Sequence, residues 1–113
     1  MKHQISTAEQ SAQELTSAQL LPSRELAAVR QLLTEGQTEA AISALNAFIE
    51  AHPDTDDLPF YLLGNAYRKQ GDWQQALNHY LEAIDRNPDS PACAARDMLM
   101  DILNFYNKDM YNQ

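Results

Sequence analysis

The sequence predicts an all-α protein made of two helical hairpins and a terminal helix. Apolar residues recur at intervals of three and four along most of the chain, which is the period of an amphipathic helix. Glycines and prolines, which end helices, interrupt this pattern at regular places. Three residues of the first predicted hairpin return 35 positions later in the second: Gly36, Ala41 and Pro53 correspond to Gly71, Ala76 and Pro88. This recurrence indicates an internal repeat of one helical pair.

Length and charge narrow the classes of protein to consider. The chain has 113 residues and a formal net charge of −8, from 16 acidic and 8 basic side chains. Its length suits one small domain, and its acidity argues against nucleic acid or an anionic membrane as partner. The sequence has no apolar run near the roughly 20 residues of a membrane span and no signal-peptide core. A single cysteine, Cys93, excludes an intramolecular disulfide. We expect a soluble, cytoplasmic protein.

Residues 1–21 show the weakest pattern. Ile5, Ala8, Ala12 and Leu15 share one face of a helix, but half of these residues are alanine, so the face is weak. Two interpretations stay open: a frayed tail, or a short helix that folds over the first hairpin. The predicted domain covers residues 22–113.

Residues 22–55 form the first predicted hairpin. Its helices are expected over residues 24–35 and 38–51, on either side of Gly36. The second helix places five apolar residues at helical spacing, which we expect to face the core: Ala41, Ile42, Leu45, Phe48 and Ile49.

Residues 57–90 form the second predicted hairpin, with helices from Pro59 to Gln70 and from Asp72 to Asn87. Gly71 suits the left-handed turn after a helix, and Asp72 with Gln75 suits a capping box at the next helix start. The hairpin carries a motif at fixed spacing: Phe60-x2-Leu63-Gly64-x2-Tyr67, then Ala76-x3-Tyr80, then Pro88. This motif closely resembles the signature of the tetratricopeptide repeat family, with aromatic residues at both positions that differ.

The resemblance implies a right-handed α-hairpin solenoid with two repeats, residues 22–55 and 57–90. The first repeat matches only in its second helix, because Glu25, Ala28, Val29 and Leu32 replace the motif residues of the first helix. In this family small motif residues let helices approach closely, so we expect Gly64 at a close helix contact. The resemblance also implies a non-catalytic adaptor that binds a protein or peptide.

In this family the first helix of each repeat lines a concave groove that receives peptides. The side chains expected off the core face here include Leu26 and Leu33, together with five residues predicted to bind the peptide: Arg30, Tyr61, Asn65, Arg68 and Lys69. The three basic residues predict an acidic segment or a terminal carboxylate as ligand. Asn65 matches the asparagine of family members that clamp a terminal carboxylate, but Leu26 stands where their first lysine would be.

Residues 91–113 are predicted to form a capping helix and a tail. Ser90-Pro91 is a typical helix start, and the helix is expected to run from Pro91 to about Tyr106. Its apolar arc is too wide for a single neighbouring helix. Either the tail folds back over the second hairpin, or two chains pack these helices together as a homodimer. The residues predicted for self-association are Leu99, Met100, Leu103 and Tyr106.

The sequence offers no constellation of residues for catalysis. His3, His52 and His79 lack a second ligand at metal-binding spacing, and Cys93 fits a small, partly buried side chain. The aspartates Asp54, Asp56 and Asp57 lack the rest of a calcium loop. We therefore expect no enzyme activity, no metal and no cofactor. Self-association as a structural module is the alternative to peptide binding.

Overall fold

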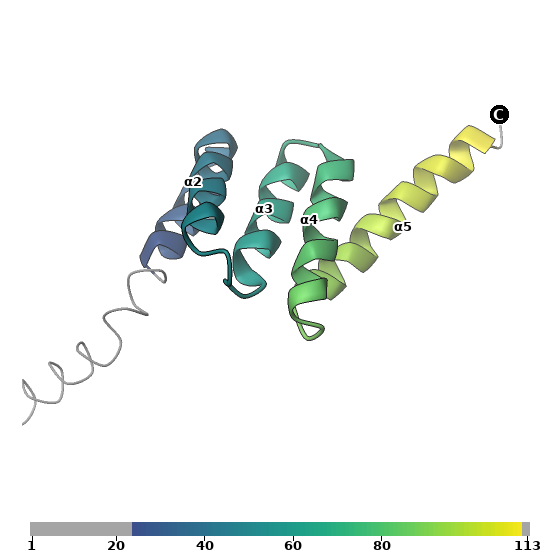
Figure 1. The fold of residues 1–113 in the computed structure, drawn as a ribbon. Coiled ribbons are helices and arrows are strands. Elements are labelled where there is room, and N and C mark those ends of the chain that lie inside the picture. The colour runs from purple at the N-terminus through teal and green to yellow at the C-terminus, as the bar shows by residue number, and fades with distance from the viewer. Residues whose placement is uncertain (1–23, 112–113) are drawn as a thin grey trace, which may run out of the picture.

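The computed structural model describes the backbone of residues 24–111 and the side chains of residues 24–105. This part of the chain contains five helices and no strand: a first helix over residues 24–34, α2 (Thr38–Ala51), α3 (Leu58–Lys69), α4 (Trp73–Arg86) and α5 (Ala92–Tyr111). Figure 1 shows the helices side by side in chain order, with α5 leaning away from α4 toward the carboxyl terminus. The predicted all-α helical repeat is confirmed. The tail or helix expected over residues 1–21 lies outside the described residues.

Both hairpin turns are set by a glycine. Gly36 and Gly71 have φ values of 80° and 79°, which favour glycine because it has no Cβ. After α3, the Asp72 N–H donates to the Tyr67 carbonyl at 2.9 Å and the Gly71 N–H donates to the Arg68 carbonyl at 2.9 Å. The same pair of bonds follows the first helix. Each hairpin therefore turns through a Schellman motif, as the glycine positions predict.

The helix starts also follow the local sequence. The Asp72 carboxylate accepts a hydrogen bond from the Gln75 N–H at 3.2 Å, and the Ser90 hydroxyl accepts one from the Ala92 N–H at 3.1 Å. The predicted end of the last helix near Tyr106 is wrong, because α5 continues to Tyr111. The sequence between these two residues contains no glycine or proline to stop the helix.

Two apolar clusters form the core. The first joins the first helix, α2 and α3, and the second joins α3, α4 and α5. Ile49, Tyr61 and Tyr67 are half-buried and pack against both clusters. Each helix in the middle of the stack is thus covered on two sides. In the first predicted hairpin, Ala41, Leu45 and Phe48 are buried as expected.

The closest helix approach lies inside the second hairpin. Tyr80 of α4 is 0% exposed, and its ring covers Gly64 of α3. A Cβ at Gly64 would overlap this ring and would lie 3.0 Å from its Cζ atom. Gly64 therefore sits at a close helix contact, as the motif predicts.

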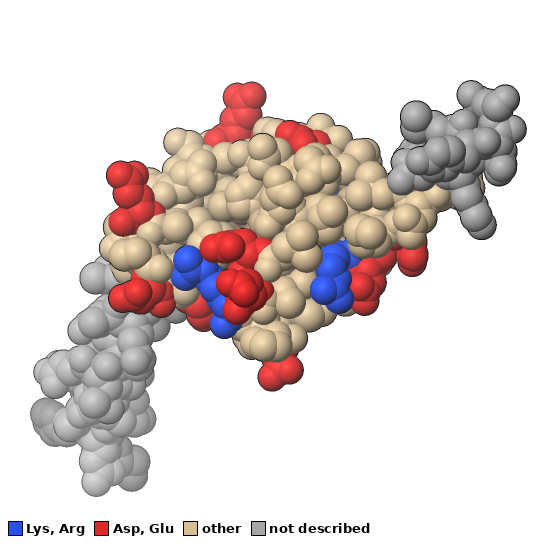
Figure 2. Space-filling view, turned by 45° about the vertical axis from the view of Figure 1, so that its right-hand side comes forward, with Lys and Arg blue, Asp and Glu red and all other residues tan. Residues whose placement is uncertain are grey.

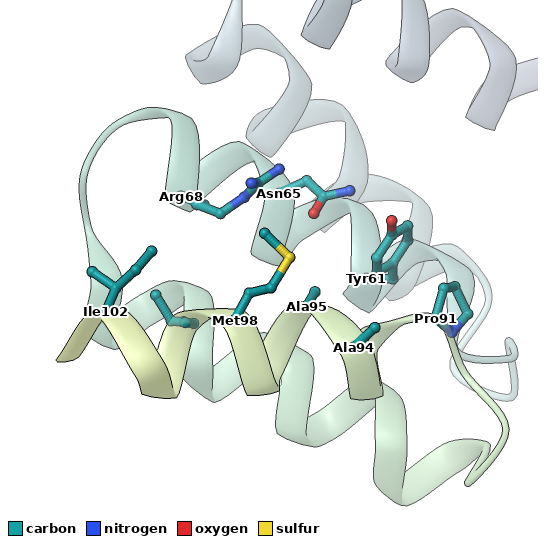
Figure 3. Close-up of a pocket in the computed structure, with 9 residues that line it drawn as sticks. Tyr61, Asn65, Arg68, Pro91, Ala94, Ala95, Met98 and Ile102 are labelled. Carbon is teal, nitrogen blue, oxygen red and sulfur yellow. The ribbon is translucent and has the colours of Figure 1, made fainter. Parts of the chain in front are cut away.

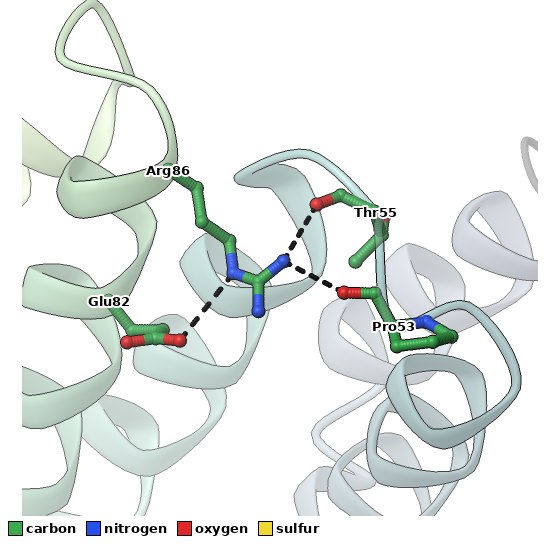
Figure 4. A network of polar contacts seen from close by, with 4 residues as sticks. All are labelled: Pro53, Thr55, Glu82 and Arg86. Atoms are coloured by element: carbon green, nitrogen blue, oxygen red, sulfur yellow. Dashed lines mark hydrogen bonds and ion pairs between the residues drawn. The ribbon is translucent and has the colours of Figure 1, made fainter.

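An arginine ties the second hairpin to the connection between the repeats. Arg86 Nη1 donates to the carbonyls of Pro53 and Thr55 at 3.1 and 2.9 Å, and its Nε lies 3.5 Å from Glu82 (Figure 4). The guanidinium also lies 4.3 Å from the centre of the Phe60 ring. This network fixes the loop after α2 against the end of α4.

Candidate peptide-binding groove

The outward face of α3 lies between two hollows, which together form the candidate groove. Tyr61, Asn65 and Arg68 stand on this face, at positions four and three apart, and line both hollows. One hollow lies toward the first helix and the other toward α5. A bound segment that crosses α3 would therefore reach both.

The hollow toward the first helix is called the basic hollow here. It has a volume of about 430 Å³. Its lining comprises Arg30, Leu33 and Thr34 from the first helix, and Tyr61, Leu62, Asn65, Arg68 and Lys69 from α3. All five residues predicted from the sequence to bind a peptide thus lie around one hollow. The three basic side chains belong to two helices and face the same space.

Two of the apolar residues expected to face this groove belong to the core. Leu26 and Leu33 are both buried, in the cluster that also contains Leu62 and Ala66 of α3. The prediction that they lie off the core face is wrong, because the first helix packs against α3 as well as α2. Leu33 still contributes to the floor of the basic hollow.

The basic residues of the hollow have no carboxylate partner within the described part of the chain. Arg30, Arg68 and Lys69 form no ion pair there, whereas Arg86 pairs with Glu82 and Arg96 with Asp97. On the face of the molecule drawn in Figure 2, each group of Lys and Arg side chains lies beside Asp or Glu. The basic hollow thus gathers three basic side chains without an ion pair among the described residues, in a chain of net charge −8.

The polar floor of the groove is held from below by Tyr80. Its hydroxyl donates to Asn65 Oδ1 at 2.6 Å. Burial raises the pKa of Tyr80, and the nearby Arg68 guanidinium partly lowers it, so the phenol stays protonated as a donor at neutral pH. Because the oxygen of Asn65 is engaged, its Nδ2 is the group left to donate, and it has no acceptor among residues 24–105. Donors of this kind suit a carbonyl or carboxylate oxygen of a ligand.

The hollow toward α5 is called the apolar hollow here, and it has a volume of about 300 Å³. Below the polar residues of α3, its lining comes from Pro91, just before the last helix, and from five residues of α5: Ala94, Ala95, Met98, Leu99 and Ile102. Figure 3 shows Met98 pointing from α5 toward Asn65 and Arg68. The sequence did not assign any of these residues to the groove, because the helix was predicted to serve for capping and, through Leu99, for self-association. The available signal was the pair of small residues Ala94-Ala95 on a helix otherwise rich in large apolar ones.

The residues predicted for self-association differ in how far their side chains are buried. Leu99 is 1% exposed in the core of its own chain, so the prediction that it contacts a second chain is wrong for this conformation. Leu103 is half-buried against the same cluster. Met100 is 39% exposed. The side chain of Tyr106 lies outside the described residues.

The remaining candidates for chemistry have structural contacts. The His52 ring stacks on Phe48, with 4.3 Å between ring centres, and the His79 ring stacks on Tyr67 at 5.2 Å. The Cys93 thiol lies 3.3 Å from the Pro88 carbonyl. His3 lies outside the described residues.

The described residues also lack two further features. They contain no group of three or more His, Cys, Asp or Glu side chains that could hold a metal ion. None of the helices there is long and apolar enough to cross a membrane.

Comparison with known proteins identifies the family. Two family models, both described as tetratricopeptide repeat, match residues 25–55 and residues 59–90. The chain belongs to the tetratricopeptide repeat family, whose repeats generally mediate protein–protein interaction and whose members are typically non-catalytic scaffolds.

A solved structure supports the same assignment. The solution NMR structure of Bacteroides fragilis protein BF1650 is similar to this chain with a TM-score of 0.70 and 58% sequence identity. The match covers 78% of this chain and 89% of that one. No curated protein matches the chain.

Proposed function

We propose that this protein is a non-catalytic adaptor that binds a protein or peptide segment in the groove formed by the two hollows. The observation that carries the proposal is the gathering of Arg30, Arg68 and Lys69 around one hollow without an acidic partner in the described residues. The net negative charge of the chain repels other acidic surfaces. The local cluster of three basic side chains attracts an acidic peptide segment and determines where that segment binds.

The chemistry of the basic hollow favours oxygen ligands with negative charge. Arginine donates paired hydrogen bonds to a carboxylate, and such charge-assisted bonds are about twice as strong as neutral ones. Asn65 Nδ2 and the guanidinium of Arg68 line the same hollow, next to the Tyr61 ring. A carboxylate in the hollow can therefore accept from two α3 side chains at once. Since the site is open to solvent, its affinity should fall as salt rises.

The experiment measures the binding of acidic peptides by fluorescence anisotropy. The probe is a fluorescein-labelled 12-residue peptide of serine and glycine with a central Glu-Glu pair and an amidated end, and a Gln-Gln version is the matched peptide. The variant combines Arg30→Gln, Arg68→Gln and Lys69→Gln, and Arg96→Gln is the matched control because Arg96 pairs with Asp97 outside both hollows.

Exposed ion pairs contribute about 0.2–1 kcal/mol each, so the triple variant should bind the Glu-Glu peptide about tenfold more weakly. The control should bind normally, and the salt dependence should be lost only in the triple variant. Equal binding of the Glu-Glu and Gln-Gln peptides by the native protein would refute a role for charge. No binding of either peptide would refute the proposal as stated.

A second candidate function, self-association, has support from Met100, which is 39% exposed on α5. A large apolar side chain on a terminal helix suits contact with a second copy. Sedimentation of the native chain and of Met100→Asp at high micromolar concentration tests this function. A substitution at buried Leu99 would unfold the core and is unsuitable. A native chain that sediments as a monomer excludes self-association as the function.

A further inference from the structure

We propose that Met98 is a site of reversible oxidation, and that the oxygen of its sulfoxide accepts hydrogen bonds from Arg68 and Asn65 and thereby closes the candidate groove. The oxidant is hydrogen peroxide, and the modified side chain links α5 to α3. The contact between the sulfoxide and α3 needs no ligand. Its effect on peptide binding rests on the proposed function.

Met98 is accessible to a small oxidant. It is 61% exposed, whereas the adjacent Leu99 is 1% exposed and Met100 is 39% exposed. A thioether that faces water meets a dissolved oxidant directly, and the sulfoxide that forms can be reduced again. Met98 is therefore expected to react before Met100.

The surroundings of Met98 suit a sulfoxide better than a thioether. Figure 3 shows its side chain pointing from α5 toward Asn65 and Arg68 of α3, which line the same hollow. Because Asn65 Oδ1 accepts the Tyr80 hydroxyl at 2.6 Å, the amide nitrogen of Asn65 remains to donate. Arg68 carries five N–H donors and forms no ion pair within residues 24–105. A thioether sulfur is a weak acceptor, so these donors gain little from reduced Met98.

Oxidation replaces this weak acceptor with a strong one. The Met98 sulfur gives an electron pair to hydrogen peroxide, so that the O–O bond breaks, an S–O bond forms and the other oxygen leaves as water. The sulfoxide oxygen carries partial negative charge and no hydrogen, so it accepts hydrogen bonds and donates none. Hydrogen bonds from a charged donor are stronger than neutral ones, so Arg68 is the main partner of this oxygen.

The contact requires rotation of side chains and no movement of helices. A methionine side chain has three rotatable bonds, and the Arg68 side chain is long and exposed. Ala94 and Ala95, one turn before Met98, are small and leave it room to turn toward α3. The floor of the hollow is fixed, because Leu99 is buried.

A sulfoxide in this position closes the groove at its centre. Arg68 and Asn65 line both hollows, and they are the α3 donors assigned above to a carboxylate of the ligand. The sulfoxide oxygen competes with that carboxylate for the same N–H groups. Loss of one hydrogen bond from a charged donor corresponds to a change in affinity of about tenfold.

The test compares the full chain with two matched variants, Met98→Leu and Met100→Leu. Leucine has a similar size and cannot form a sulfoxide. Each protein is treated with hydrogen peroxide, and mass spectrometry of its proteolytic fragments identifies the oxidised methionines. Met1, Met110 and Cys93 are present in every sample, so an effect of their oxidation appears in Met98→Leu as well. Circular dichroism confirms that each protein is folded.

The first readout is the nitrogen–proton NMR spectrum in the absence of a peptide. In the native protein and in Met100→Leu, oxidation should shift the side-chain signals of Arg68 Nε–H and Asn65 Nδ2–H and slow the exchange of the Arg68 proton with water. In Met98→Leu these signals should stay unchanged. Unchanged signals after complete oxidation of Met98 would refute the contact, and so would a Met98 that stays reduced while Met100 is oxidised.

The second readout is the anisotropy of the Glu-Glu peptide described above. Oxidation should weaken its binding about tenfold in the native protein and in Met100→Leu and should not change its binding to Met98→Leu. Methionine sulfoxide reductases for both epimers, supplied with a dithiol, return the sulfoxide oxygen to water and convert the dithiol to a disulfide. This treatment should restore the original affinity.

Different results overturn the two proposals. If the oxidised native protein binds the Glu-Glu peptide as tightly as the reduced protein does, oxidation does not close the groove. This inference then fails and the proposed function stands. If no acidic peptide binds to the reduced protein, the proposed function fails, and the NMR spectrum alone then decides whether α3 holds the sulfoxide of Met98.

Discussion

Replacing Gly64 by alanine tests whether the close contact between α3 and α4 holds the second repeat together. The new Cβ would overlap the Tyr80 ring, which is 0% exposed and whose hydroxyl is bound to Asn65 at 2.6 Å. The ring therefore has little freedom to move. Overpacking of this kind costs about 1–3 kcal/mol. If the ring shifts enough to break the hydrogen bond from the Tyr80 hydroxyl to Asn65, the loss of unfolding free energy grows by about 0.5–1.5 kcal/mol.

One effect opposes this loss. Alanine favours a helix interior over glycine by about 1 kcal/mol. The net result expected for Gly64→Ala is a loss of about 1–3 kcal/mol of unfolding free energy. For a domain of this size that loss lowers Tm by roughly 5–20 °C. Gly64→Leu should be more destabilising, because its side chain needs space that the Tyr80 ring occupies.

The assay is urea unfolding followed by circular dichroism, with a double-mutant cycle as control. In a Tyr80→Leu background the ring is absent, so Gly64→Ala should become neutral or stabilising through helix propensity alone. A native-like urea midpoint for Gly64→Ala in the original background would refute the reasoning. So would an equal destabilisation in both backgrounds, since the cost would then not arise from the ring.

Two more predictions concern single side chains of the second repeat. Arg86→Gln should lower the unfolding free energy by about 1–3 kcal/mol, because the carbonyls of Pro53 and Thr55 lose their charged donor. An unchanged urea midpoint for Arg86→Gln, measured beside Arg96→Gln, would contradict this role. Tyr80 should ionise only above the ordinary tyrosine value of about 10, because its burial raises its pKa. The unfolded chain then loses the Tyr80 proton at a lower pH than the folded chain does, so the unfolding free energy should decline as pH rises above about 10. The measurement is absorbance of the folded protein at 295 nm as a function of pH. If all tyrosines ionise in one step near pH 10, the prediction for Tyr80 is contradicted.

The hairpins could be predicted because their signals are local. Gly36 and Gly71 end helices through hydrogen bonds that reach only five residues back along the chain. Asp72 and Ser90 start helices through bonds to the next turn. Interactions of this range are fully contained in a short stretch of sequence, and the 35-residue recurrence then identifies the repeat.

The choice of buried face could not be predicted in the same way. Met98, Leu99 and Met100 are adjacent apolar residues, yet Leu99 is 1% exposed while Met98 is 61% exposed. The sequence shows a wide apolar arc, and only the direction from which α4 packs decides which part of it is covered. Leu26 and Leu33 illustrate the same point. The helical period of the apolar residues placed them on the outer face of the first helix, but contact with α3 buries them.

The sequence by itself determined the class of fold, the two repeats and the positions of the turns, because these depend on contacts within one or two helical turns. The tertiary structure alone decided that Arg30 meets Arg68 and Lys69 around one hollow, and that alanines of α5 leave another hollow beside it. Residues more than 30 positions apart share a site only through the angle and offset at which helices pack. The packing angle and offset are determined by how side chains of neighbouring helices fit together across the whole stack. A local sequence pattern does not specify that fit.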